Sequence, residues 1–453
     1  MRLCFTEDLL RNVSAMCKNT PSMTARIHYL TPKPEPIGLF IRIGSSGHHQ
    51  LETLHSSGRL PVDRVVAEAA SFKSQGELLG LLRNTGAEIT LDTRVAELSE
   101  AGSYVPSAQW LTSVDKTRPM APRDFAGDGC RRIASEVATF AVMNAVETVL
   151  APSHFLTNSL SRWWPIDRQL CVELRRALDE VGGDGIGIDY SLTTAYGTLR
   201  EPEQRRAFLA GLEDLPFDNL WLRISDFGAD ATPTAVRRYI SALADFHALK
   251  HPLVADNVGG LAGLAVAAFG ATGAIAHGVS EKERFDVRRW LVRKPGGGGQ
   301  SGRVYLPALD RYFKIDEARA LLEVRGARRL LACEDRDCCP RGADDTFNDP
   351  KAHFITQRLA QLRDLSDTAE ERRVSRFLDV HLASADRRSR QSAKLDTSNA
   401  TTKRALQKAS LRLDRMRDVL ENLDQTLGRE HSRSVSLRQR SNRGRTGQGR
   451  QGG

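Results

Sequence analysis

Apolar runs of strand length alternate with amphipathic runs of helical length between about residues 37 and 280. The short runs predict eight strands, at residues 37–43, 62–66, 87–91, 145–150, 186–189, 220–224, 252–255 and 274–276. Apolar residues with helical spacing predict helices at residues 168–181, 201–212, 234–249 and 261–269. Alternation of strands and helices predicts a parallel sheet covered by helices, and eight is the strand number of a (β/α)8 barrel. An open doubly wound sheet is the alternative.

The remaining segments predict additions to this barrel, which we expect to occupy residues 1–290. A Pro-, Asp- and Gly-rich stretch predicts an insertion at about 102–140, after the third strand. The KPGGGGQSG segment at 294–302 predicts a flexible connector, and VYLPALDRYFK predicts one or two short strands. We expect a zinc-binding subdomain at 303–360 and a helical extension at 361–428.

One helix of this extension, at 403–428, carries apolar residues at heptad spacing. They are Leu406, Ala409, Leu413, Met416, Leu420, Leu423 and Leu427. Such a seam is buried only when a second helix covers it. The partner is either a helix of the same chain, for instance 355–385, or a second copy in a homodimer.

Composition and charge narrow the class of protein. Hydrophobic residues make up 40% and charged residues 27%, which excludes a fibrous or wholly disordered chain. Seven cysteines, an odd count in a large chain, do not resemble a secreted disulfide framework. The first residues lack a signal peptide's apolar run, and no stretch is long and apolar enough to span a membrane. These features predict a cytoplasmic protein without membrane contact.

The net charge of +9 is concentrated at the C-terminus. Residues 429–453 hold seven Arg and one Glu, a charge of +6, which leaves +3 for the rest of the chain. Gly, Ser and Gln replace apolar residues there, so the tail is expected to be disordered. It is either a nucleic-acid-binding arm, which would contact phosphates, or a solvated tail without a partner.

Polar residues at the ends of the predicted strands are the candidates for chemistry, because barrel enzymes place reactive groups there. They are Asp92, His154, Asp189, Arg223, Asp226, Asp256, Asn257 and His277. Each aspartate could instead cap the following helix. The Gly259–Gly260 pair at a helix start either binds an anion such as phosphate through its backbone N–H groups or permits close helix packing. Trp163 and Trp164 either stack on a base or pack at the rim.

A second cluster consists of Cys333, Cys338, Cys339 and His353. Thiolates and an imidazole close in sequence, with turn residues between them, are typical of a tetrahedral structural zinc site. Adjacent cysteines are an unusual ligand pair. One of them could be replaced by an outside ligand such as Asp337, or the cluster could hold no metal.

The order of these features resembles the tRNA-guanine transglycosylase family over about residues 85–360. That family has a barrel, an essential Asp in a TDSGG-like strand end, and a Cys/His zinc subdomain after the last strand. LDTRVAELS places Asp92 at a comparable position, and IGIDYSLTTAYG, DNLWLRISDFG and HPLVADNVGG…GAIAHG resemble the later strand ends. The family's CxCxxC is replaced here by CxxxxCC with a closer His.

The resemblance implies cleavage or exchange of a nucleobase at its N-glycosidic bond in DNA or RNA. Asp92 would move a proton or act electrostatically, and Asp189 and Asp256 would complete an acidic rim. Where the family has its nucleophilic Asp this chain has His277, a poor substitute for a carboxylate that forms a covalent intermediate. Base excision through activated water is therefore favoured. The alternatives are an inactive nucleic-acid-binding relative and an unrelated barrel enzyme with a phosphate-bearing substrate.

Overall fold

The computed structural model describes residues 36–44, 47–102, 110, 112–113, 118–280, 283–292 and 302–427, all within one compact unit. The N-terminal 35 residues, most of the predicted connector at 294–302 and the basic tail at 429–453 lie outside the described residues. In the described part, no helix has the length and apolar character needed to cross a membrane.

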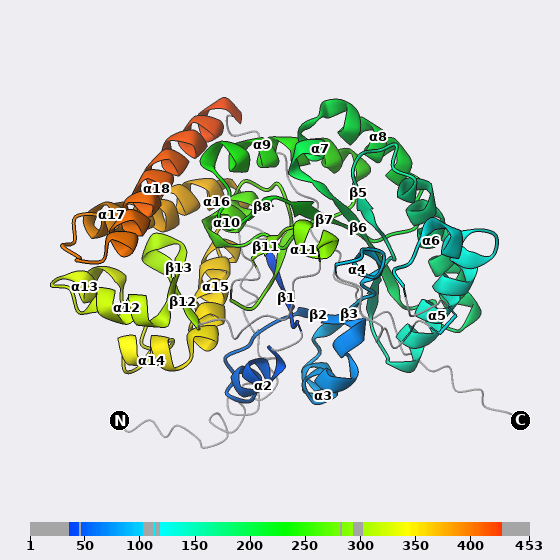
Figure 1. Ribbon diagram of the computed structural model, residues 1–453, viewed down its shortest axis with the longest axis horizontal. Coiled ribbons are helices and arrows are strands. Elements are labelled where there is room, and N and C mark those ends of the chain that lie inside the picture. The colour runs from blue at the N-terminus through cyan, green and yellow to red at the C-terminus, as the bar shows by residue number, and fades with distance from the viewer. Residues whose placement is uncertain are drawn as a thin grey trace, which may run out of the picture. The chain divides into compact units, whose positions relative to one another are not determined.

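Eight parallel strands form a closed barrel (Figure 1). They are β1 (Gly38–Arg42), β2 (Arg64–Glu68), β3 (Glu88–Asp92), β4 (Thr148–Leu150), β6 (Gly187–Ala195), β7 (Asn219–Ser225), β9 (Leu253–Asp256) and β10 (Ala274–Gly278). Each of them pairs with the next, and β10 pairs with β1 to close the ring. All eight predicted strands and the barrel are confirmed, and the open-sheet alternative is wrong.

Helices follow the strands around the barrel. The longer ones are α2 (His48–Ser56), α3 (Gly76–Asn84), α5 (Gly129–Met143), α6 (Trp163–Glu180), α8 (Pro202–Leu212), α9 (Pro233–Leu243) and α10 (Gly260–Ala268). The start of α9 is encoded locally, since the Thr232 hydroxyl accepts from the Ala235 amide and Pro233 takes the first helical position. The insertion predicted at 102–140 is too long, because residues from Gly129 onward already belong to α5.

Strand alternation sorts the side chains into an inner and an outer layer. The barrel axis is filled by Phe40, Val66, Leu150, Trp221, Val254, Ala274 and Ala276. Their neighbours along the strands, such as Leu39 and Ile41, face the helices and join the large outer core. A residue one position before or after an axial residue therefore points away from the barrel interior.

Residues after the barrel add a hairpin and a group of helices. The hairpin consists of β12 (Arg303–Leu306) and β13 (Arg311–Lys314), which confirms the predicted short strands. The helices are α12 (Ile315–Leu322), α13 (Ala327–Leu331), α14 (Ala343–Asn348), α15 (Pro350–Ser366), α16 (Glu370–Arg376), α17 (Ala383–Ser392) and α18 (Ala400–Leu427). Because α15 runs across residue 360, no structural boundary lies between the predicted zinc subdomain and helical extension.

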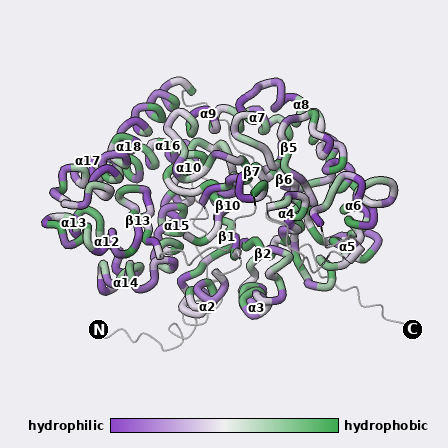
Figure 2. Tube along the Cα trace, viewed as in Figure 1, coloured by the Kyte–Doolittle hydropathy of each residue, from purple (hydrophilic) through white to green (hydrophobic). Residues whose placement is uncertain are grey.

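The predicted heptad helix is α18, and its seam is covered within the chain. It packs against α17 and α9, beside the barrel (Figure 1). Its residues from Leu406 to Leu423 at the predicted positions are buried, whereas Leu427 is 37% exposed. In Figure 2 the tubes of α17 and α18 change between hydrophobic and hydrophilic along their length, as expected for helices with one buried face. The seam therefore needs no second copy of the chain.

Candidate functional site

Two arginines and two aspartates form a closed ring inside the carboxyl end of the barrel. Arg42 donates to both oxygens of Asp256, at 2.6 and 2.7 Å, and from Nη1 to Asp92 Oδ2 at 2.7 Å. Arg223 donates from Nε to Asp256 Oδ2 at 2.7 Å and from Nη2 to Asp92 Oδ2 at 2.8 Å. Each charge in the ring thus contacts two charges of opposite sign.

The four side chains meet because each lies at an inward-facing position near the end of its strand. Arg42, Asp92 and Asp256 are the last residues of β1, β3 and β9, and Arg223 lies near the end of β7. Phe40 precedes Arg42 by two residues and lies on the barrel axis, so Arg42 points to the same side. The ring therefore forms the layer directly above the apolar axial residues.

Both aspartates remain ionised although they are buried. Burial opposes the charge on Asp92, but Arg223 and Arg42 outweigh it and hold the pKa of this carboxyl below its usual value. Burial also opposes the charge on Asp256, and Arg42 and Arg223 again lower the pKa. Asp92 is 5% exposed and Asp256 is not exposed at all, so Asp92 is the carboxylate of this pair nearer to solvent. Neither group can donate a proton near neutral pH.

Asp189 lies in a different layer from the ring. The predicted strand end at this residue is wrong, because β6 continues to Ala195. Asp189 accepts from Arg64 at 2.8 Å, Asn219 at 2.7 Å and the Trp221 indole at 2.7 Å. Arg64 and Asn219 are the first residues of their strands, so this cluster lies toward the amino end of the barrel. Burial raises the pKa of Asp189 to about 6.

His154, in the loop after β4, forms a buried pair with Asp167 of α6. Its Nδ1 lies 2.5 Å from Asp167 Oδ1, and its backbone amide donates to Oδ2 at 2.9 Å. The imidazole stacks on Trp163 with ring centroids 3.9 Å apart, which favours the packing role for this tryptophan. Trp164 packs against Phe208 of α8, in the core between the helices and the barrel strands. His154 Nε2 is buried and has no hydrogen-bond partner among the described residues.

His277 does not lie in the barrel mouth. Ala276 faces the axis, so the next residue along β10 faces the helices. There His277 contacts the Phe354 ring, and its Nε2 lies 4.0 Å from Glu283. Burial lowers the pKa of His277, so the imidazole is neutral at pH 7. The prediction that His277 belongs to the catalytic rim is wrong on this geometry.

The helix start at Gly259–Gly260 is filled by the chain's own carboxylates. Glu283 accepts from the Gly260 amide at 2.8 Å, and Asp310 accepts from the Leu261 amide at 3.1 Å. A Cβ on Gly259 would lie 2.1 Å from Glu283, so glycine is needed for this close approach. The predicted anion site is therefore wrong, since its N–H groups already bind internal anions.

Strained backbone marks the residues that follow several barrel strands. Arg94, Asp226, Asn257 and Ser280 have positive φ angles between 59° and 67°. Asp226 is half-exposed and pairs with Arg288 at 3.3 Å, outside the ring. Asn257 donates to Asp256 Oδ1 at 3.2 Å and so borders the ring. Non-glycine residues adopt such conformations mainly where surrounding contacts impose them, as in binding sites.

The predicted metal ligands come together at the start of α15. The ligand atoms of Cys333, Cys338, Cys339 and His353 all lie within 4.8 Å of one another. Asp337 is exposed and does not belong to this group. All described cysteines are free thiols. The cluster could therefore hold a metal ion through three sulfurs and one nitrogen.

The distances in this cluster fit a tetrahedral ion. The Cys338 and Cys339 sulfurs are 3.7 Å apart, and each lies 3.4 Å from His353 Nδ1. A tetrahedron with metal–sulfur bonds of about 2.3 Å has sulfur–sulfur edges of ~3.8 Å. His353 Nε2 lies 3.2 Å from the Tyr305 carbonyl, which can only accept, so Nδ1 turns its lone pair toward the sulfurs.

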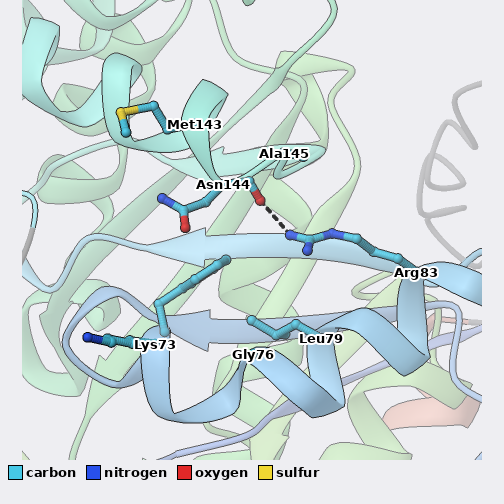
Figure 3. A pocket seen from close by; sticks show the side chains of 8 residues that line it. Lys73, Gly76, Leu79, Arg83, Met143, Asn144 and Ala145 are labelled. Atoms are coloured by element: carbon cyan, nitrogen blue, oxygen red, sulfur yellow. Dashed lines mark hydrogen bonds between the residues drawn. The ribbon is translucent and has the colours of Figure 1, made fainter.

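A hollow at the other end of the barrel is separate from these sites. Figure 3 shows it between α3 and the end of α5, where Arg83 donates to the Asn144 carbonyl at 2.5 Å. Both elements lead into the amino ends of strands β3 and β4. In barrels this end contributes to stability, and catalytic groups lie at the opposite end.

Three residues of these sites do not follow from the sequence reasoning. Arg42 could have been recognised as a candidate, because it is a single charged residue within an apolar strand. Asp167 could not, because a carboxylate on an exposed-looking helix is ordinary. Glu283 lies in a loop, and the spacing of loop residues in the sequence does not predict which residues they contact.

No family model and no curated protein matches this chain. An endo-1,4-beta-xylanase from Penicillium canescens is 9% identical, with a TM-score of 0.36 over 54% of this chain and 82% of that one. A type I 3-dehydroquinate dehydratase from Clostridium difficile is 7% identical, with a TM-score of 0.34 over 57% and 90%. A carboxyl transferase domain of Rhizobium etli pyruvate carboxylase is 10% identical, with a TM-score of 0.36 over 87% and 63%. Likenesses this low carry no argument about function.

Proposed function

We propose that this protein is a transglycosylase-like barrel enzyme that cleaves the N-glycosidic bond of a nucleobase in DNA or RNA. The supporting observation is Asp92, which is kept ionised at the carboxyl end of the barrel. Its position matches that of the essential Asp in the family that the sequence resembles. Cleavage of this bond develops positive charge on the sugar, which a fixed carboxylate stabilises.

The role of Asp92 in this proposal is electrostatic. Arg42 and Arg223 both donate to its Oδ2, and the Arg94 amide donates to Oδ1 at 3.0 Å. These contacts keep the carboxylate ionised and fix its orientation before substrate enters. A carboxylate with a lowered pKa does not serve as a proton donor, so the departing base takes its proton from another group.

His154 is the group best suited to proton transfer. Asp167 orients its ring through Nδ1, and Nε2 is buried without a hydrogen-bond partner in the described structure. This arrangement of a carboxylate, an oriented imidazole and a free ring nitrogen is the one that acid–base catalysis uses. Asp92 is the last residue of β3, and His154 follows the neighbouring strand β4, whose last residue, Leu150, pairs with Asp92 in the register. In this proposal His154 transfers the proton to the departing base.

Excision is favoured over exchange. Exchange through a covalent intermediate needs a free carboxylate nucleophile, and His277 faces away from the barrel interior. Asp92 and Asp256 are both held by two arginines, which reduces their nucleophilicity. In excision, water adds to the anomeric carbon as the bond to the base breaks. The base leaves with a proton from His154, and the proton lost by the water restores His154.

The metal cluster has a structural role in this proposal, and zinc is the ion that suits its donors. Three thiolates and one imidazole leave no open position for substrate. Gln357 lies 3.6 Å from the Cys333 sulfur and Thr346 lies 3.3 Å from the Cys339 sulfur, so second contacts hold the ligands in place.

A nucleic-acid-binding relative without catalysis is the second candidate. The observation in its favour is the charge balance of the ring, in which two arginines satisfy both aspartates. The Gly259–Gly260 helix start does not support the phosphate-substrate barrel enzyme, because carboxylates fill it.

The proposal is tested by incubating the purified full chain with DNA and RNA that carry natural and modified bases, followed by mass spectrometry of the free bases. Release of one base supports it. Tight binding without release, in a protein with its metal bound, supports the second candidate.

A further inference from the structure

A cavity of about 400 Å³ lies outside the barrel ring, between the β12–β13 hairpin, α18 and the loops after β7 and β10. The loop residues Ala229, Asp230 and Glu283 follow the carboxyl ends of their strands. The cavity therefore lies toward the same end of the barrel as the candidate site. The chemistry proposed above uses none of its lining residues.

The lining carries more positive than negative charge. Its cations are Arg284, Arg303, Arg311, Lys408 and Arg412, and its anions are Asp230, Glu283 and Asp310. The anions already have close partners: Asp230 pairs with Arg284 at 2.6 Å, and Asp310 with Arg412 at 3.0 Å. Glu283 pairs with Arg358, behind the cavity wall, at 2.8 Å. The carboxylates of the wall are thus used within the protein.

Two cations of the lining lack such partners. Within the described part of the chain, Arg311 and Lys408 form no ion pair, and both are exposed to solvent. Partial burial and the neighbouring charges of Arg412 and Arg303 lower the pKa of Arg311. Arg412 already pairs with Asp310, so the charges left to be balanced are those of Arg311 and Lys408, and a bound anion would offset the repulsion at Arg311.

The volume and the lining of the cavity indicate a ligand larger than an inorganic ion. A volume of about 400 Å³ is within the ~300–1,000 Å³ range of small-molecule sites. Tyr305 and Tyr312 line one wall with ring centroids 5.2 Å apart, and their hydroxyls bind Asp310 and Glu283. Tyrosine rings beside guanidinium groups suit a phosphate attached to an organic group, since arginine donates two parallel hydrogen bonds to phosphate oxygens.

We propose that this cavity binds a phosphate group of an organic ligand, with Arg311 and Lys408 as its principal contacts. The phosphate could belong to the backbone of a polynucleotide or to a small phosphate ester, because both present the same oxygens. The proposal does not depend on base release.

The test measures binding of two probes by the full chain: inorganic pyrophosphate, and a short single-stranded oligonucleotide without terminal phosphates. The variant carries Arg311→Gln and Lys408→Gln, which remove exposed and unpaired side chains and should leave folding unchanged. Two control variants remove positive charge elsewhere. Arg206→Gln alters an exposed arginine of α8, across the barrel, and Arg206→Gln with Arg168→Gln matches the double variant in net charge.

We expect the Arg311/Lys408 variant to lose about tenfold or more in affinity for at least one probe, as removal of two charge-assisted contacts predicts. The matched control should keep its affinity within about twofold. Loss for the oligonucleotide alone assigns the cavity to a polynucleotide backbone, and loss for pyrophosphate assigns it to a small phosphate ester. Equal losses in the variant and the matched control, or no binding of either probe by the wild type, would overturn the proposal.

Discussion

Asp256 is fully buried and ionised because Arg42 and Arg223 surround its two oxygens. A buried pair of this kind stabilises a protein little relative to an apolar pair, but loss of one partner leaves a charge without compensation. The four side chains of the ring are therefore energetically coupled, because each one compensates the buried charge of its two neighbours.

Asp256→Asn should lower the free energy of unfolding at pH 7 by about 3–5 kcal/mol, since it leaves two arginines sharing one carboxylate. The folded pKa of Asp256 lies below the unfolded value of about 3.9, so its charge contributes stability above that pH. This contribution is lost as the pH falls through the folded pKa. Urea unfolding between pH 7 and pH 3 should show the gap between wild type and variant narrowing below pH 4. A gap that stays constant over this range contradicts the account.

At the residue scale the sequence located strand ends better than it located side-chain directions. A polar residue beside an apolar run can be recognised from the sequence alone, and this pattern identified Asp92, Arg223 and Asp256. Asp189 was misplaced because the alternating residues after it, YSLTTA, continue the strand. The prediction for His277 is wrong because successive side chains of a strand point alternately into the barrel and toward the helices. A shift of one residue therefore moves a side chain to the opposite side of the sheet.

The Cys/His cluster is the clearest case at the scale of elements, because the sequence predicted that its four side chains come together. The cysteines lie before and within the turn that leads to α14, and His353 lies in the first turn of α15. The helices on either side of this turn contribute Leu331 and Phe347 to an apolar cluster, and an ion would in addition tie the turn itself to α15.

Elemental analysis should find about one zinc per chain in the purified protein. Cys338→Ser and treatment with a chelator should both lower the melting temperature, because metal-binding energy contributes to folding. Cys130→Ser, at a buried thiol far from the cluster in sequence, is the control and should keep the zinc. Protein that is folded, equally stable and free of metal would refute this prediction.

α18 gives the second prediction at the level of elements. Leu413 is fully buried, whereas Leu411 on the same helix is 57% exposed. Leu413→Ala should lower the free energy of unfolding by about 2–5 kcal/mol, as for other buried leucines. Leu411→Ala should change it by less than about 0.5 kcal/mol. Light scattering should give the same mass for both variants and the wild type. A mass halved by Leu413→Ala would show that the seam joins two copies.

The sequence predicted this helix and its buried positions from heptad spacing, but it left the partner open. Spacing identifies which side chains are covered, and only the path of the chain decides what covers them. The start of α15 was also predicted too late, because Pro350 at the first helical position was not recognised as a start.

On the scale of the whole molecule, barrel closure depends on strand twist and stagger, which alternation of strands and helices does not encode. The count of eight strands was the one feature of the sequence that indicated a closed barrel. The distribution of charge was visible directly, since the terminal 25 residues carry +6 of the net +9.

Deletion of residues 429–453 should weaken polynucleotide binding and leave the barrel chemistry intact, because the deletion removes six net positive charges and no ring residue. Each phosphate contact contributes a slope of about −0.9 in log affinity against log salt concentration on duplex DNA. The truncated chain should therefore show a shallower salt dependence. If the full and truncated chains gave identical binding curves across a salt series, the tail would not contact the polynucleotide.

Base release measures most directly whether Asp92 stabilises positive charge on the sugar of a polynucleotide substrate. Asp92→Asn should reduce the rate of release by about 10²-fold or more. It will also lower stability, so the rate is compared with that of Asp256→Asn, which removes the same charge from the same ring at a position without exposure. We predict that the Asp92 variant, assayed well below its melting temperature, loses far more activity than the Asp256 variant. Full activity of Asp92→Asn on a substrate that the wild type cleaves would contradict the account.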